Sequence, residues 1–210
     1  MSARRGGFTP RLALACACAL LAMPGAVSAE VKDSGPDGFT LENAGWVPTD
    51  RDTAWNTLVN EVGQWWPADH TWGGDAGKLS IDPRVGGCFC EIDATRQAEH
   101  LRVVFAEPGR LLRMTGGLGP LQSMGVHGVL EFRLTAAQQG GRDGTRIVLY
   151  YRAGGYGPED LGAFAPIVDK VQAQQLGGLL ARLGGSAEPA GTAVQADGPA
   201  DGTAAADDAP

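Results

Sequence analysis

Short segments in the middle of the chain alternate apolar and polar residues with a period of two, and this pattern constrains the fold more than any other feature. The segments lie between residues 78 and 152, are separated by turn residues, and read KLSI, CFCEI, HLRVVFA, RLLRMT, VHGVLEFRL and TRIVLYYR. A period of two is typical of strands that bury one face and expose the other. The sequence therefore predicts an antiparallel meander.

The alternation also assigns side chains to the two faces of the predicted sheet. In residues 126–134, Leu130 and Phe132 fall on one face, whereas Glu131 and Arg133 fall on the other. His127 belongs with the polar set. One dry face and one wet face are expected when a sheet is covered on one side only.

The last apolar stretch of the chain supplies that cover. Residues 166–183 place apolar side chains at helical spacing, Pro166 suits a first helical turn, and Gly184 and Gly185 end the pattern. A strand over residues 39–47, a helix capped by Thr49 and a tryptophan-rich loop precede the meander. These elements predict an α+β domain with one long helix across a curved antiparallel sheet.

The two ends of the chain have a different composition from the middle. Residues 1–29 contain three arginines, an apolar run and a final AVSA, which together predict a signal peptide cleaved after Ala29. Residues 30–37 are expected to be a linker, and residues 38–185 to form the domain. Residues 186–210 are rich in Ala, Gly, Asp and Pro, and are expected to be a disordered acidic tail. The protein is therefore expected to be exported to the periplasm or the medium, without spanning the membrane.

The charge balance argues against a nucleic-acid partner. The whole chain has a formal charge of −7, and removal of residues 1–29 leaves 14 basic and 24 acidic residues, a charge of −10. Nucleic-acid binding needs a basic surface.

Six segments resemble one known superfamily in the same order along the chain. They are WWP (65–67), IDPRVGGCFCE (81–91), EPGRLLRMTGGLGPL (107–121), GVLEFRL (128–134), GTRIVLYYRAGGY (144–156) and PIVDKVQAQQLGGLLARL (166–183). They resemble the SRPBCC superfamily, also called START-like or the birch-pollen-allergen fold, and its branch of chaperone-ATPase-activator homologues. That branch tends to carry an arginine near Cys88, which this chain lacks.

The resemblance implies a helix-grip fold, in which the sheet wraps around the C-terminal helix and leaves an apolar cavity. It implies a hydrophobic ligand, and it transfers no catalytic set. The chaperone-activating role is not carried over, because its partner is cytosolic and this chain is predicted to carry an export signal.

We expect the cavity to be lined by aromatic and apolar side chains of the sheet, the tryptophan-rich loop and the last helix. The candidate ligand-binding residues are Trp65, Trp66, His70, Trp72, Cys88, Cys90, Leu112, Met114, Leu130, Phe132, Tyr151, Phe164 and Val168.

Cys88 and Cys90 lie two apart on a predicted strand and should share one face, which the alternation makes the dry concave face. Strand residues at this spacing are about 6.6 Å apart with parallel side-chain vectors, which disfavours a disulfide. Two cysteines with His70 do not form a recognisable zinc signature, so no metal and no cofactor are expected. Buried thiols that pack as small apolar groups are the main interpretation.

Three functions remain open from the sequence. The first is a non-enzymatic binding protein for a small hydrophobic molecule. The second is a cyclase or dehydratase that uses the same cavity, with His70 as general base and Asp69, Arg113, Tyr150 or Tyr151 as positioning groups. The third is an interaction module whose cavity is filled by its own side chains; its protein partner is unknown.

Overall fold

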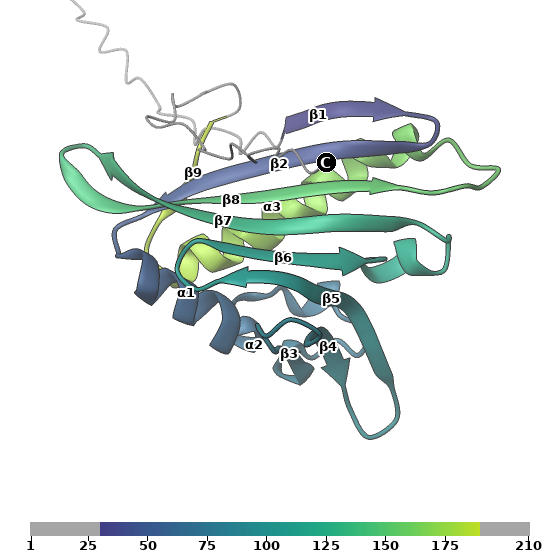
Figure 1. The fold of residues 1–210 in the computed structure, drawn as a ribbon, viewed down its shortest axis with the longest axis horizontal. Helices are drawn as coiled ribbons and strands as arrows, with labels where there is room; N and C mark the ends of the chain where they lie inside the picture. The colour runs from purple at the N-terminus through teal and green to yellow at the C-terminus, as the bar shows by residue number, and fades with distance from the viewer. Residues whose placement is uncertain (1–29, 190–210) are drawn as a thin grey trace, which may run out of the picture.

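The period-two segments form one curved antiparallel sheet in the computed structural model, which describes residues 30–189 (Figure 1). The strands are β1 (Glu30–Gly35), β2 (Gly38–Val47), β3 (Leu79–Ile81), β4 (Cys88–Ile92), β5 (Gln97–Glu107), β6 (Leu111–Gly116), β7 (His127–Gln139), β8 (Arg142–Gly154) and β9 (Ser186–Ala187). Their order across the sheet is β1-β2-β8-β7-β6-β5-β4-β3, and β9 pairs with β2. The predicted meander is confirmed from β3 to β8, and β2, the strand predicted over residues 39–47, pairs with β8.

The helical segments of the described residues lie in the connections between strands. They are α1 (Arg51–Asn60), α2 (Val62–Trp65), η1 (Ala68–His70), η2 (Ala76–Lys78), η3 (Gly119–Gln122), η4 (Leu161–Phe164) and α3 (Ala165–Arg182). The cap of α1 is Asp50, not Thr49, because the Asp50 carboxylate accepts a hydrogen bond from the Thr53 backbone N–H at 2.8 Å. Within residues 30–189, no helix is both long enough and apolar enough to cross a bilayer.

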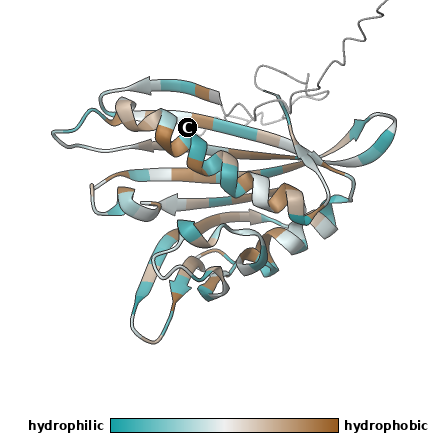
Figure 2. Ribbon diagram, turned by 180° about the vertical axis from the view of Figure 1, so that it is seen from behind, coloured by the Kyte–Doolittle hydropathy of each residue, from teal (hydrophilic) through white to brown (hydrophobic). Residues whose placement is uncertain are grey.

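The long helix α3 lies across the concave face of the sheet, as Figure 2 shows from the helix side. Leu176, Leu179 and Leu180 of its C-terminal half are buried in the core. The backbone at Gly178 lies so close to α2 that a Cβ atom there would be 2.1 Å from the Trp65 carbonyl oxygen. The C-terminal half of α3 therefore packs tightly against the domain. The predicted α+β helix-grip architecture is confirmed.

The two faces of the sheet separate as the alternation predicts, with one difference. Leu130 and Phe132 are buried on the concave face, but Glu131 on the convex face is also buried. Arg113 and Arg133 both bind its carboxylate. Burial raises the pKa of Glu131, but the two hydrogen-bonded arginines outweigh burial and hold the pKa below its ordinary value.

The folded region is longer at both ends than expected. Residues 30–35, expected to belong to a linker, form β1, because a polar edge strand needs only its backbone groups to pair with β2. After α3, the Arg146 guanidinium binds the Glu188 carboxylate through two oxygens, with Nε–Oε1 and Nη2–Oε2 distances of 2.9 Å. The predicted signal peptide and nearly all of the predicted tail lie outside the described residues.

Candidate functional site

A cavity of about 390 Å³ lies between the N-terminal half of α3 and the segments that face it. One wall comes from η4 and α3 and consists of Phe164, Ile167, Val168, Val171, Gln172 and Gln175. A second wall comes from η1 and its flanking residues and consists of Trp66, Asp69, His70, Thr71 and Trp72. The rest comes from β5 and from η3 with its flanking residues, and consists of His100, Leu118, Gly119, Pro120, Leu121 and Met124. Side chains therefore do not fill the interior, in contrast to the interaction-module hypothesis.

A buried carboxylate holds the tryptophan-rich wall in place. Glu91 of β4 is 2% exposed and accepts hydrogen bonds from the backbone N–H groups of Trp72, at 2.9 Å, and Gly73, at 2.8 Å. Its Oε2 atom also lies 3.3 Å from Nε2 of His100. Hydrogen bonds from backbone N–H groups to a charged acceptor are strong, so Glu91 fixes the loop that carries Trp72.

The two adjacent tryptophans have different roles. The Trp66 indole N–H donates to the His70 carbonyl at 3.1 Å, and its ring packs edge-on against Phe89 with centroids 4.9 Å apart. This contact shapes the cavity wall. The Trp65 indole N–H instead donates to the Thr57 carbonyl of α1 at 3.2 Å, inside the core.

The cavity wall is mainly apolar, and its polar groups include several buried atoms without partners. Neither polar atom of the Gln172 amide has a hydrogen-bond partner in the described part of the chain, and the residue is 0% exposed. Oε1 of Gln175, one helical turn later, is also unpaired, as is Nδ1 of His70. An apolar cavity with a few convergent polar groups is typical of small-molecule sites.

The structure separates the candidate ligand-binding residues into two groups. Trp66, His70, Trp72, Phe164 and Val168 line the cavity. The others except the cysteines lie in the packed core, and these are Trp65, Leu112, Met114, Leu130, Phe132 and Tyr151. The reason is the close contact of the C-terminal half of α3, which covers the centre of the sheet and leaves space only near the N-terminus of the helix.

Tyr151 illustrates the difference between the core and the cavity. Its hydroxyl is buried and has no hydrogen bond of normal geometry within residues 30–189. Burial raises the pKa of Tyr151 to about 12, an effect that the nearby Leu118 backbone only partly offsets. A phenol in this environment stays protonated, which does not suit a general base.

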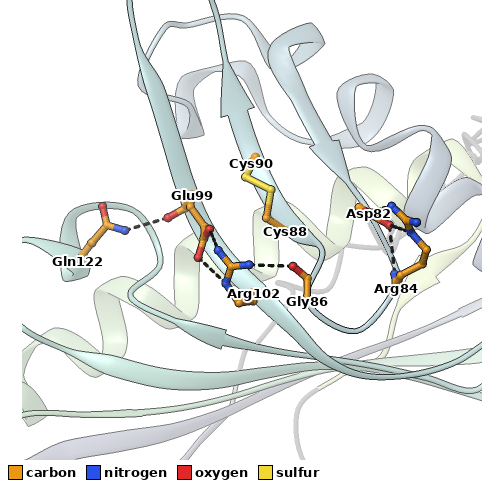
Figure 3. The surroundings of a disulfide bond; sticks show 8 residues. All are labelled: Asp82, Arg84, Gly86, Cys88, Cys90, Glu99, Arg102 and Gln122. Carbon is orange, nitrogen blue, oxygen red and sulfur yellow. Dashed lines mark hydrogen bonds and ion pairs between the residues drawn. A yellow bond between two sulfur atoms is a disulfide. The ribbon is translucent and has the colours of Figure 1, made fainter.

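The prediction for the cysteines was wrong on two counts. Cys88 and Cys90 form a disulfide, with Cα atoms 5.5 Å apart, and they do not face the cavity. Figure 3 shows the bridge beside the ion pair of Glu99 and Arg102 from β5.

The concave position belongs to Phe89, which is 1% exposed and packs in the core. Two observations explain the error. The larger apolar surface of Phe89 gains more from burial than a cysteine does. The pairing with β5 also shifts register between Phe89 and Cys90, and this irregularity lets the two Cα atoms approach more closely than in a regular strand.

Several lining residues were missed from the sequence. His100 was not among the candidate residues, but it is buried in β5 and lines the cavity. Gln172 was not singled out, although a glutamine on the apolar stripe of α3 was a usable signal. Leu118, Leu121 and Met124 come from a glycine-rich connection whose path depends on tertiary contacts.

The proposed catalytic set does not assemble. Asp69 and His70 line the cavity, but Arg113 binds Glu131 on the convex face. Tyr150 is also on that face, where its ring packs under the Arg133 guanidinium at 4.4 Å.

A curved antiparallel sheet, a C-terminal helix across its concave face and an apolar cavity between them define an α+β helix-grip protein. This is the fold of the SRPBCC superfamily, which the sequence resemblance implied. The assignment rests on the element order and sheet topology described above.

Comparison with known proteins gives distant structural likenesses. No protein-family model and no curated protein matches the chain. Protein MLL2253 from Mesorhizobium loti is 18% identical, with 67% of this chain and 93% of that chain covered and a TM-score of 0.46. CalU16 from Micromonospora echinospora is 16% identical, with coverages of 72% and 81% and a TM-score of 0.47. Ara h 8.0201 is 13% identical, with coverages of 69% and 96% and a TM-score of 0.45.

The environment of His100 leads to a prediction about pH. Burial lowers the pKa of His100, and the hydrogen bond and charge of Glu91 only partly offset that effect. The folded protein therefore keeps the ring neutral at a pH where the unfolded chain, with a histidine pKa of about 6.5, binds a proton. This contribution to stability is present above about pH 6.5 and is lost as the pH falls through that value.

The free energy of unfolding is measured with urea at pH 7.5 and at pH 5.5. We expect the decrease from pH 7.5 to pH 5.5 to be smaller in His100→Gln than in the unchanged protein. The matched control is His127→Gln, because His127 is exposed. Equal pH dependence in His100→Gln and the unchanged protein would contradict the assignment.

Proposed function

We propose that this protein is an exported, non-enzymatic binding protein that holds a small hydrophobic molecule between the sheet and α3. The observation that carries the proposal is the apolar cavity of about 390 Å³ under the N-terminal half of α3. Small-molecule sites usually measure about 300–1,000 Å³, so the volume suits a compact ligand. Removal of apolar ligand surface from water supplies the binding free energy, about 25 cal/mol per Å² buried.

The polar groups of the cavity favour binding over catalysis. Gln172 and Gln175 provide amides, which form hydrogen bonds but do not exchange protons near neutral pH. His70 lines the cavity, but no side chain of the described residues is seen to orient its ring through a hydrogen bond. A general base is usually held by such a partner. Of the groups proposed for the cyclase-like alternative, only His70 and Asp69 line the cavity.

Two features support export. Residues 1–29 have the composition of a signal peptide. The Cys88–Cys90 disulfide suits an oxidising compartment, where such bonds persist. Native mass spectrometry of protein recovered from the periplasm or the medium tests this part. The expected species begins at Glu30 and carries a bound small molecule, and a mass that includes residues 1–29 would refute cleavage.

A cavity-filling substitution tests the binding site. In Val168→Trp, the new indole occupies the space beneath α3, and we expect the affinity for the neutral fluorescent probe N-phenyl-1-naphthylamine to fall about tenfold or more, which corresponds to about 1.4 kcal/mol. The control is Val104→Trp, the same change at a side chain that is 42% exposed on β5. The control should bind the probe as the unchanged protein does.

Two outcomes would refute the container role. The first is that the unchanged protein does not bind the probe. The second is that both tryptophan variants bind it equally well, because the probe would then sit elsewhere. Thermal unfolding of each variant checks that a loss of binding does not come from a loss of folding.

A further inference from the structure

The unpaired amides of α3 carry an inference about which hydrophobic molecule the cavity accepts. It rests on the proposed function and narrows it. Gln172 and Gln175 are three residues apart in α3, so their side chains lie on the same helix face. Both residues line the cavity.

The Gln172 amide offers both a hydrogen-bond donor and an acceptor, and neither is paired in the described part of the chain. The side chain is fully buried, and both Nε2, a donor, and Oε1, an acceptor, lack partners among residues 30–189. Oε1 of Gln175, on the same face of the helix, is a second acceptor without a partner among these residues. Buried polar groups are normally paired, because each forfeits its bonds to water when it is buried.

Another buried polar residue of α3 shows the usual solution. Asp169 accepts a hydrogen bond from Nδ2 of Asn43 in β2 at 3.1 Å. The side chain that faces the sheet is thus paired within the protein, whereas the amides that line the cavity are not. Because both residues line the cavity, a molecule held there is the candidate partner for these amides.

The charges of the cavity wall restrict that partner further. In the described part of the chain, the wall contains no lysine or arginine, and its one carboxylate belongs to Asp69. Burial lowers the pKa of His100, which disfavours a positive charge on its ring. An anionic ligand would enter without a counter-ion, and a carboxylate could accept from Gln172 Nε2 but could donate nothing to Oε1.

We propose that the cavity selects neutral, compact hydrophobic molecules that present a hydrogen-bond donor and acceptor side by side, as a lactam or a carboxamide does, and that Gln172 pairs with this group. The ligand's carbonyl accepts from Nε2 of Gln172, and its N–H donates to Oε1. The apolar body of the ligand contacts Val168, Phe164 and Trp66. Fatty-acid anions and plain hydrocarbons are both disfavoured.

Three ring systems of similar size test the proposal: 2-quinolone, a neutral lactam; naphthalene, which has no polar group; and 2-naphthoate, an anion. Binding is measured by the change in tryptophan fluorescence. We expect the unchanged protein to bind 2-quinolone at least about tenfold more tightly than naphthalene, since a well-placed hydrogen bond to an otherwise unpaired group has about this effect. 2-Naphthoate should bind most weakly.

The substitution Gln172→Leu keeps the approximate size of the side chain and removes the amide. It should abolish the preference for 2-quinolone while leaving naphthalene bound equally well or better. The melting temperature should stay the same or rise, because an unpaired buried amide is replaced by an apolar group. The matched control is Gln138→Leu, on the exposed end of β7, which should bind all three compounds as the unchanged protein does.

The outcomes separate this inference from the proposed function. If naphthalene and N-phenyl-1-naphthylamine bind, but 2-quinolone has no advantage that depends on Gln172, the container role stands and the inference is overturned; water then satisfies the amides. If 2-naphthoate binds most tightly, the inference is overturned in favour of an anionic ligand. If no probe binds the unchanged protein, both proposals fail.

Discussion

Gly178→Ala is expected to lower the free energy of unfolding by about 3 kcal/mol, which is large for the addition of one methyl group. The added Cβ would lie 2.1 Å from the carbonyl oxygen of Trp65. Because that oxygen belongs to the backbone of α2, no rotamer change relieves the contact, and α3 and α2 must move apart. Chemical denaturation measures the loss.

The neighbouring glycine provides a matched control. A Cβ at Gly177 would have no atom within 4 Å, so Gly177→Ala should raise the free energy of unfolding by about 0.5–1 kcal/mol through helix propensity alone. The same substitution at two adjacent positions should therefore change the free energy of unfolding in opposite directions. A stabilised Gly178→Ala variant would contradict the close approach of α3 to α2.

Phe132→Ala should cost about 3–5 kcal/mol of unfolding free energy, because a large apolar side chain is removed from the packed core. Phe132 is 1% exposed, and its ring packs edge-on against Trp65 with centroids 6.2 Å apart. The measurement is urea-induced unfolding of the variant and the unchanged protein.

Phe105→Ala is the control for Phe132→Ala. Phe105 is 41% exposed on the convex face, where its main specific contact is the Arg113 guanidinium at 5.5 Å from the ring centroid. This variant should lose about 1 kcal/mol or less. Comparable losses in the two variants would contradict the assignment of Phe132 to the core.

The architecture could be predicted because backbone geometry fixes the side-chain period of a strand and that of a helix. Side chains alternate strictly along a strand, so Leu130 and Phe132 had to share a face, and the stripe on residues 166–183 had to cover it. Similar reasoning failed for the CFCEI segment. Its alternation divides the residues into two sets, but it does not say which set is inside.

Tertiary contacts determine which side chains of that segment are buried. Glu91 is buried because backbone N–H groups from the tryptophan-rich loop, 18 and 19 residues earlier, bind its carboxylate. Phe89 is buried because Trp66 packs against it. Neither contact can be read from a local pattern, and the disulfide on the opposite face follows from the inward positions of these two residues.

The position of the cavity was equally inaccessible from the sequence. The apolar stripe of α3 runs its full length, and nothing in it distinguishes the half that touches the sheet from the half that stands away. Gly178 permits the close contact near one end, while Gln172 and Val168 line the cavity nearer the other. The core residues that were proposed to line the cavity therefore lie in the part of the interior that the C-terminal half of α3 covers.

The unequal attachment of α3 sets a rule for compounds designed to occupy the site. After the C-terminus of α3, the chain is held to the sheet by the pairing of β9 with β2 and by the ion pair of Arg146 with Glu188. A substituent that extends from a bound core toward that end meets packed side chains. One that extends toward η1 and η3 passes between short connecting segments, so elaboration of a first hit should proceed in that direction alone.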